Sequence, residues 1–366
     1  MITLGGMRYK HGWDEPREVI PADTLEEVTS SVTKAFELGI NHIETAYGYK
    51  KSEHAYGKVL NDVLRVKREN YYLMTKGAPK TPDETRKMVE KQLEALKTDY
   101  IDFYGWHGIN DEESFQTACK NQGPVHELLK LKEEGIIHHV GFSTHAPLDV
   151  VLKTIRTDLF EFVNLHYYYF FQRNKPAVDL AKEKDMGVFI ISPNDKGGQL
   201  SKPPLKLKNL TLPFTPAQWN AKFCLGNDAI HTLSFGFPAT VSFDEVSGIF
   251  PVSSPLGIRE ERIKEKLDEQ VSLYPYGKFD GYEMENDPSG INIPEILRFR
   301  KLWKCYDMKN FGIYRYNMFK EHDRWFGGAF PTPDKLAKID MSKCPPSIPL
   351  KQLLIETHQA LYRERK

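Results

Sequence analysis

The stretch Ile137-His138-His139-Val140-Gly141-Phe142 has the composition of a buried strand, and the segments that follow it indicate the fold. Its apolar residues do not alternate cleanly with polar ones, which is typical of a parallel strand covered on its outer face. An amphipathic pattern over residues 147–156 follows, and the next short apolar run ends at Leu165. This order predicts a βα unit, in which a helix connects two parallel strands.

The same βα pattern repeats through the first 250 or so residues. The predicted strands end near Met7, Glu44, Lys76, Trp106, Phe142, Leu165, Ile191 and Ser234. Amphipathic patterns between them predict helices over residues 24–38, 52–64, 82–96, 124–134, 147–156, 175–184, 216–225 and, least regularly, 243–249. Eight such units in about 250 residues favour an α/β fold of the (β/α)8 TIM barrel type over an open doubly wound sheet.

The residues beyond the eighth unit form an appendix to this barrel. We predict a barrel over residues 1–255 and, packed on it, a C-terminal extension over residues 256–366, mainly helical and irregular. Helical patterns in the extension cover residues 258–270 and 294–308, and a long irregular tail is expected after them. The lysine-rich stretch 202–208 is predicted to be a solvated loop.

Charge and composition exclude several classes of protein. Fifty basic and fifty acidic residues cancel, so the net charge favours neither nucleic acid nor an anionic membrane as a partner. None of the four cysteines belongs to a C-x-x-C pair, and no run of about 18 apolar residues occurs. We expect an unprocessed, soluble, cytoplasmic protein without a bound metal; its oligomeric state is not indicated by the sequence.

Four polar side chains follow the predicted strands at the end where barrel enzymes place their active sites. They are Glu44, Tyr49, Lys76 and His107. A tyrosine with an ordinary pKa near 10 needs a nearby cation to act as a general acid, and Lys76 is placed to supply it. Glu44 is then expected to pair with Lys76, and His107 to orient a substrate oxygen.

These four residues resemble the catalytic tetrad of the aldo-keto reductase family. The stretch Glu44-Thr45-Ala46-Tyr47-Gly48-Tyr49-Lys50-Lys51-Ser52-Glu53 follows the signature of that family, and Gly141-Phe142-Ser143-Thr144-His145 is a further match. The resemblance implies a nicotinamide-dependent oxidoreductase of carbonyls or secondary alcohols, with Tyr49 as general acid and base. It also implies that Ser143 and Asn164 bind the nicotinamide carboxamide.

The predicted cofactor site collects residues from the ends of several strands. It comprises Gly6, Met7, Ser143, Asn164, Ser192, Asn194, Lys196, Gly236 and Phe237. The loop Lys196-Gly197-Gly198 has the composition of a phosphate-contacting loop. No basic residue occurs in Gly236-Phe237-Pro238-Ala239-Thr240, where relatives bind the 2′-phosphate, so NAD is favoured over NADP.

Three features depart from the family pattern. Glu44 stands in place of an aspartate, and Lys50 in place of a glycine. In the branch that this chain resembles most, four cysteines of the C-terminal extension hold a [4Fe–4S] cluster before an Asn-Ile-Pro-Glu-Ile segment. That segment is present at residues 292–296, but the ligand positions are Lys278, Gly281, Met284 and Asp287, so no iron–sulfur cluster is expected.

Two other functions remain open on this sequence. The same residues suit a lyase or epimerase that moves a proton without net redox change. A non-catalytic regulatory subunit with a degenerate site is the second alternative, and the intact set of Tyr49, Lys76 and His107 argues against it.

Overall fold

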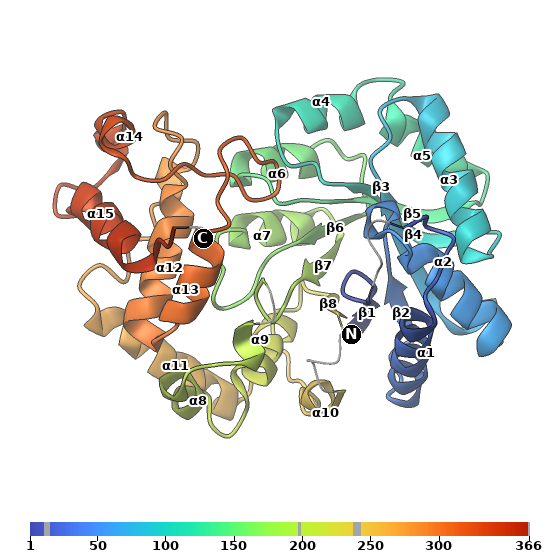
Figure 1. Cartoon of the computed structure of the whole chain (residues 1–366), viewed down its shortest axis with the longest axis horizontal. Coiled ribbons are helices and arrows are strands. Elements are labelled where there is room, and N and C mark those ends of the chain that lie inside the picture. Colours follow the sequence, from blue (N-terminus) through green and yellow to red (C-terminus); the bar gives the residue numbers. More distant parts are fainter. Residues whose placement is uncertain (11–14, 197–198, 237–242, 365–366) are drawn as a thin grey trace.

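The computed structural model describes residues 1–366 except 11–14, 197–198, 237–242 and 365–366, and it contains a closed barrel of eight parallel strands (Figure 1). The strands are β1 (Ile2–Gly5), β2 (His42–Glu44), β3 (Tyr72–Gly77), β4 (Ile101–His107), β5 (Ile137–Ser143), β6 (Phe162–Leu165), β7 (Gly187–Ile191) and β8 (Thr232–Gly236). Each pairs with the next in sequence, and β8 closes on β1 through the pair Thr3 and Ser234. The predicted (β/α)8 barrel is therefore confirmed.

Helices cover the outside of the barrel. They are α1 (Ala22–Glu37), α2 (Ser52–Gly57), α3 (Pro82–Leu96), α4 (Glu112–Cys119), α5 (Pro124–Glu133), α6 (Leu148–Ile155), α7 (Lys175–Glu183), α8 (Leu205–Thr211), α9 (Pro216–Leu225) and α10 (Phe243–Ser247). Their starts follow from local chemistry: Thr81 caps α3 by accepting the Glu84 amide, and Thr215 and Gln218 form a capping box at α9.

One prediction in this region is wrong. The stretch 202–208, expected to be a solvated loop, runs into α8, which begins after Pro204. Leu207 is fully buried on this helix. The lysines between the apolar positions suggested a solvated loop, but Leu207 and Thr211, one turn apart, are both buried and hold this short helix against the protein.

Aromatic side chains close one end of the barrel interior. Phe162 and Phe189 stack with ring centroids 5.0 Å apart, and Phe103 lies 5.7 and 5.4 Å from them. His42 packs on the same group and hydrogen-bonds Thr3 at 2.9 Å. Because all strands are parallel, the opposite end collects every carboxyl terminus and the loops that follow the strands.

The extension contains five α-helices among the described residues. They are α11 (Ile258–Leu273), α12 (Ile293–Tyr306), α13 (Lys309–Tyr316), α14 (Pro333–Ala337) and α15 (Leu350–Leu361). The first two were predicted, but the expected irregular tail is wrong, because α13, α14 and α15 lie within it. Leu350, Leu354 and Leu361 are completely buried along α15. Figure 1 shows these helices on the side of the barrel opposite α1 and α2.

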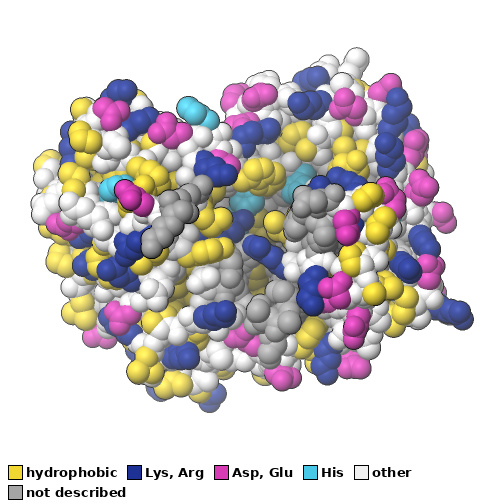
Figure 2. All heavy atoms as spheres, in the orientation of Figure 1, with side chains coloured by type: hydrophobic (Ala, Val, Ile, Leu, Met, Phe, Trp, Pro, Cys, Tyr) yellow, Lys and Arg dark blue, Asp and Glu magenta, His cyan; other side chains and the backbone are white. Residues whose placement is uncertain are grey.

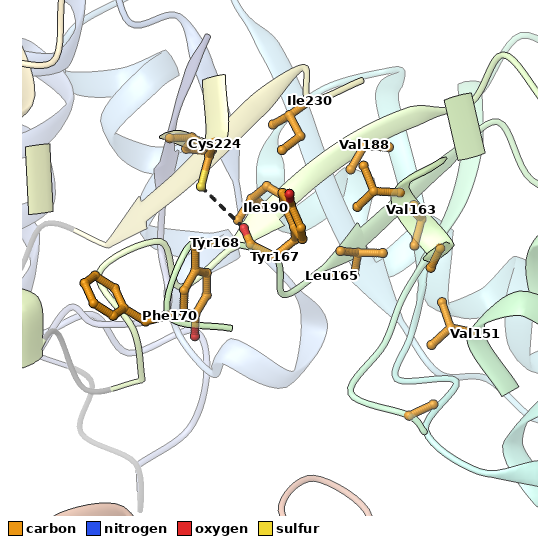
Figure 3. Close-up of a cluster of buried hydrophobic side chains, with 14 of the residues drawn as sticks. Val151, Val163, Leu165, Tyr167, Tyr168, Phe170, Val188, Ile190, Cys224 and Ile230 are labelled. Carbon is orange, nitrogen blue, oxygen red and sulfur yellow. Dashed lines mark hydrogen bonds between the residues drawn. The ribbon is translucent and has the colours of Figure 1, made fainter. Parts of the chain in front are cut away.

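One contiguous cluster of buried apolar side chains links the barrel to the extension. Figure 3 shows part of it, where Val163 and Leu165 of β6 meet Val188 and Ile190 of β7. Cys224 of α9 joins the cluster and donates a hydrogen bond to the Tyr167 carbonyl at 3.4 Å. The exact division of the chain at residue 255 stays a prediction.

Arg298 of α12 is buried where the extension meets the barrel. Its guanidinium donates to Asp195, in the loop after β7, at 2.9 Å and to Glu295 of its own helix at 2.7 and 2.9 Å. A further bond of 3.2 Å reaches the carbonyl of Phe170, in the loop after β6. The hydroxyl of Tyr168 also donates to Asp195, at 2.8 Å. Two barrel loops and one extension helix are thus bound at a single guanidinium.

Within the part of the chain that the structure describes, no helix has the length and apolar character needed to span a membrane.

The packing of α12 predicts a large effect for Ile296→Ala. The Ile296 side chain is fully buried, so truncation should lower the free energy of unfolding by about 2–5 kcal/mol. Ile258→Ala, at a residue that is 77% exposed on α11, should change it by less than about 0.5 kcal/mol. Urea unfolding followed by tryptophan fluorescence measures both. A separate early transition in Ile296→Ala would show that the extension unfolds independently of the barrel, and a change below about 1 kcal/mol would contradict the packing argument.

Candidate active site

The four predicted catalytic side chains lie together at the carboxyl end of the barrel. Glu44 is the last residue of β2, Lys76 is near the end of β3, and His107 ends β4. Tyr49 lies in a single 3₁₀ turn, Tyr47–Tyr49, directly after β2. The barrel register therefore brings to one place residues that are up to 63 positions apart in sequence, from Glu44 to His107.

Glu44 and Lys76 form a buried ion pair. The Lys76 ammonium donates to Glu44 Oε1, and the two side chains are only 1% and 4% exposed. The second carboxylate oxygen of Glu44 accepts a hydrogen bond from the Ser234 hydroxyl of β8. Gly105, the register partner of Lys76, leaves room for this arrangement, since a Cβ there would lie 3.1 Å from the lysine stem. The longer glutamate thus reaches across the barrel mouth to two strands.

Tyr49 lies against this pair and is half-buried. The Lys76 Nζ is 5.0 Å from the centroid of its ring. Burial raises the pKa of the Tyr49 phenol, while the Lys76 ammonium opposes that rise through its charge and a hydrogen bond. Because the carboxylate of Glu44 neutralises part of the lysine charge, the three groups form one coupled electrostatic unit.

His107 lies on the other side of the tyrosine. The two rings meet edge to face with centroids 5.7 Å apart. Burial, together with the nearby Lys76 ammonium, lowers the pKa of His107 to about 3. Its imidazole is therefore neutral at neutral pH and can donate a hydrogen bond without adding a second positive charge beside Lys76.

A buried polar network supports the strand that carries Lys76. Glu53 of α2 accepts hydrogen bonds from Thr75 and from Gln92 of α3, both at 2.6 Å. The Tyr104 hydroxyl donates to the other end of Gln92 at 2.8 Å. Glu53, which sequence matching includes only as part of a signature, therefore ties α2 and α3 to β3.

Lys50 departs from the family glycine at a conformationally demanding position. Its backbone φ is 53°, in the left-handed region that glycine adopts without strain. The residue directly after Tyr49 thus turns the chain sharply into α2, which gives a backbone reason for a glycine there in relatives.

The predicted nicotinamide ligands lie side by side. Ser143 ends β5, and its register partner on β6 is Asn164. Both side chains are almost completely buried, and Ser143 also pairs with His107 in the register between β4 and β5. A hydroxyl and an amide are therefore presented next to the imidazole.

Other predicted cofactor residues lie in the segments that follow β1 and β7. Met7 is exposed after β1, while Gly6 is buried against α2, where a Cβ would clash with Ser52 and Tyr56. Ser192 and Asn194 follow β7, and the buried Oδ1 of Asn194 has no hydrogen-bond partner among the described residues.

Lys196 and Gly236 complete the predicted set within the described chain. Burial and the charge of Arg315 lower the pKa of Lys196 to about 7. Gly236 ends β8, and a Cβ on it would lie 3.1 Å from the Arg8 side chain. Arg8 thus brings a cation to the end of β8 from the loop after β1. Phe237, together with Gly197 and Gly198, lies outside the described residues.

The extension adds residues that sequence reasoning missed. Trp325 lies in the segment between α13 and α14, and its ring centroid is 5.3 Å from that of His107 and 5.2 Å from that of His145. Gly108 makes this contact possible, since a Cβ there would be 2.7 Å from the indole. No local pattern around Trp325 points to the site, because only the docking of the extension brings it there.

The residues at the four positions compared above with cluster ligands do not fit an iron–sulfur group. Met284 is buried, and a Cβ on Gly281 would lie 2.8 Å from Leu297. Asp287 accepts the backbone amides of Ser289 and Asp340 at 2.9 and 3.0 Å. Across the described residues, no group of three or more histidine, cysteine, aspartate or glutamate side chains is arranged to hold a metal.

Comparison with known sequences identifies one family. The sequence model described as "Aldo/keto reductase family" matches residues 1–206, more than half of the chain. An L-galactose dehydrogenase of Arabidopsis thaliana is 31% identical over 182 residues, which are 46% of this chain and 55% of that protein. An uncharacterized oxidoreductase of Bacillus subtilis, YqkF, is 26% identical over 186 residues, 48% of this chain and 58% of its own length. The chain thus spans about half the length of the curated relatives it matches.

Solved structures share the fold at lower identity. The holo form of an aldo-keto reductase from Bacillus halodurans has a TM-score of 0.56 and 22% identity, covering 72% of this chain and 91% of that one. A glycerol dehydrogenase from Gluconobacter oxydans has a TM-score of 0.57 and 18% identity, covering 73% and 91%. These likenesses support the barrel architecture.

The environment of His107 predicts that its imidazole does not titrate near neutral pH. Because its folded pKa is about 3 and the ordinary value is about 6.5, the unfolded chain takes up a proton first as the pH falls, so this residue makes the folded state less stable below about pH 6.5. Ring resonances in a ¹³C-labelled NMR sample, assigned by their loss in His107→Gln, should stay constant from pH 8 to 5. A midpoint near 6.5 would contradict the buried, neutral imidazole.

Proposed function

The chain belongs to the aldo/keto reductase family, and from this membership and the geometry of the tetrad we propose that it is an NAD(P)-dependent oxidoreductase of small carbonyl or secondary alcohol substrates. The observation that carries the proposal is the coupled unit of Tyr49, Lys76 and Glu44, with the neutral ring of His107 against the phenol. A nicotinamide cofactor, when bound, supplies or accepts the hydride.

Tyr49 acts as the proton donor in the reducing direction. Its hydroxyl gives a proton to the carbonyl oxygen as that oxygen becomes an alkoxide, and Lys76 stabilises the phenolate that remains. His107 donates a second hydrogen bond to the same oxygen, which fixes the orientation of the carbonyl. In the oxidising direction the same groups work in reverse.

Glu44 positions Lys76 rather than touching the substrate. Its two oxygens hold the ammonium of Lys76 and the hydroxyl of Ser234, so the lysine cannot turn away from the phenol. The replacement of the family aspartate is accommodated because the longer side chain reaches β8.

Residues at the barrel mouth fit a nicotinamide cofactor. Ser143 and Asn164 offer a hydroxyl and an amide to a carboxamide, and the unpaired Oδ1 of Asn194 accepts from a ligand donor. Lys196 and Arg8 supply positive charge near the ends of β7 and β8. We propose that these residues hold the cofactor across the mouth.

We further propose that the extension works without an iron–sulfur cluster. No thiolate is available at the four positions Lys278, Gly281, Met284 and Asp287. Gly281 and Met284 are closely packed, and the carboxylate of Asp287 accepts backbone hydrogen bonds. Electrons then pass only as hydride between the soluble cofactor and the substrate.

Replacing the proposed acid tests the mechanism. Tyr49→Phe should lower the single-turnover rate about 10²-fold or more while the cofactor dissociation constant stays nearly unchanged. Methylglyoxal and L-galactose, substrates that relatives are named for, serve as the first probes. Tyr72→Phe, a tyrosine 50% exposed on β3, controls for the loss of a hydroxyl elsewhere. An unchanged rate in Tyr49→Phe would refute the assignment.

Removing the ammonium of Lys76 should lower the single-turnover rate at least as much as Tyr49→Phe does. Lys76→Met leaves the carboxylate of Glu44 buried without its partner, so both the rate and the stability should fall, the latter by about 3–5 kcal/mol. The double variant Lys76→Met, Glu44→Leu should recover stability without recovering the rate. Recovery of both would mean that the pair serves only the fold.

Cofactor choice is tested by titration with both oxidised forms. One missing charge-assisted contact is worth about 1.5–3 kcal/mol, which removes a tenfold preference for NADP, so NAD should bind equally well or better. Fluorescence quenching in low and moderate salt measures both. NADP binding more than tenfold tighter, and weakened selectively by Lys196→Ala or Arg8→Ala, would overturn the choice of NAD.

The absence of cluster ligands has its own test. Protein purified and reconstituted anaerobically with iron and sulfide should contain no stoichiometric iron after desalting. Broad visible absorbance together with bound iron and sulfide would contradict the proposal.

A further inference from the structure

A cavity of about 410 Å³ lies between the barrel mouth and the extension. The barrel side is formed by the loops after β4, β5, β6 and β7, and the opposite side by α12, α13 and the segment that carries Trp325. Figure 2 shows this face hollowed between the two parts, with Lys, Arg and His side chains in the hollow. The tetrad residues do not line the cavity, but Trp325 belongs to its wall and contacts His107.

The cavity wall is rich in hydrogen-bond donors that have no partner. In the described chain, eight buried side-chain nitrogen or oxygen atoms lack a hydrogen bond, and four of them belong to the wall. They are Nδ2 of Asn110, Nδ1 of His166, Nε of Arg173 and Nε of Arg315. Three are obligate donors, and an orphaned buried donor costs about 1–3 kcal/mol. Such a group of orphans indicates a ligand that accepts hydrogen bonds.

Among these four residues, Arg315 of α13 gives the strongest evidence for a ligand. It is 5% exposed, and among the described residues no carboxylate forms an ion pair with it. Its guanidinium instead lies 3.8 Å from the centroid of the Phe326 ring and donates to the sulfur of Met318 at 3.3 Å. A buried guanidinium in contact with an aromatic ring and a thioether has exchanged water for very weak partners.

The acidic side chains of the wall are already engaged. Glu285 pairs with Arg173 at 2.6 Å, and Asp111 pairs with Arg324 at 2.8 Å. Asp287 and Asp323 accept backbone amides. Within the described residues, none of these carboxylates forms an ion pair with Arg315.

The carboxylates nearest Arg315 are paired with another guanidinium. Asp195 and Glu295 are both bound by Arg298, while Arg315 and Lys196 add two further basic groups. The lowered pKa of Lys196, to about 7, reflects burial and the charge of Arg315. His145 and His166 add no charge, because burial holds the pKa of each well below its usual value. The wall thus has five basic and five acidic side chains among the described residues, and Arg315 is the guanidinium that no carboxylate pairs with.

We propose that this cavity binds the carboxylate of a small organic acid, with Arg315 as its ion-pair partner. A carboxylate matches the planar guanidinium and carries a single charge, whereas a dianionic phosphate would be repelled more strongly by the acidic side chains of the wall. That this acid is the carbonyl substrate rests on the proposed function: its far end would pass Trp325 toward His107. The extension, and not the barrel, would then select the substrate class.

Calorimetric titration of the full-length chain with benzoylformate and with its methyl ester tests the site without requiring turnover. The two probes share a ketone and differ in the carboxylate. The acid should bind at least tenfold more tightly than the ester. Arg315→Gln should abolish that difference, Arg315→Lys should keep part of it, and Lys309→Gln, which removes a charge from the same helix, should keep all of it. Circular dichroism confirms that each variant is folded.

The other outcomes separate this site from the reaction. Equal binding of acid and ester to the unmodified chain, or a preserved difference in Arg315→Gln, would overturn the proposal. It would also be overturned if inorganic phosphate bound more tightly than benzoylformate, or if Arg315→Gln weakened NAD or NADP rather than the acid. Selective binding without oxidation of NADH or NADPH would support the carboxylate site and contradict the proposed reaction.

Discussion

The buried guanidinium of Arg298 is the interaction on which the assembly of barrel and extension depends. It binds Asp195, Glu295 and a carbonyl oxygen from three separate segments, and all of these groups are withdrawn from water. Loss of one partner from such a buried set costs about 3–5 kcal/mol, because an uncompensated charge remains inside the protein. The loops after β6 and β7 and the helix α12 are therefore fixed relative to one another. The part of the extension that faces the barrel mouth, called the roof here, consists of α12, α13 and the segment that carries Trp325.

That roof changes the surroundings of the tetrad. The indole of Trp325 packs on His107, and burial together with the Lys76 ammonium lowers the pKa of His107 far below the ordinary value. Burial also strengthens the pairing of Lys76 with Glu44, since both charges lie in a medium of lower effective dielectric than water. The catalytic groups proposed here thus belong to the barrel, and one of them, His107, is in contact with the extension.

Much of the barrel was predictable from the order of apolar runs and amphipathic stretches. The eight strand ends lie within about two residues of the predicted ones, because a parallel strand must be apolar on both faces and a glycine or polar residue ends it. Helices α4, α8, α13, α14 and α15 were missed. Each is short, and short helices are marginal by propensity alone, so burial such as that of Leu354 decides whether they form.

The residues of the candidate site also fall into two groups, those predicted from the sequence and those found only in the structure. Tyr49, Lys76 and His107 were predicted because they lie at or after strand ends in a repeating pattern, and parallel strands bring such residues to one end of the barrel. Ser234, Trp325 and Arg315 were not recognised. Their roles come from contacts across 190 residues for Ser234 with Glu44, and between the extension and the mouth for the other two.

The sequence by itself determined the class of fold, the order of its strands and the chemical groups at their ends, since periodicity and residue type act locally along the chain. Only the tertiary structure decided which carboxylate oxygen Lys76 and Ser234 each bind, that α12 docks on the loops after β6 and β7, and that Arg315 is buried without an acidic partner among the described residues. These features arise from the closure of the barrel and the packing of the extension. Both depend on distances between residues far apart in the chain, which no local pattern records.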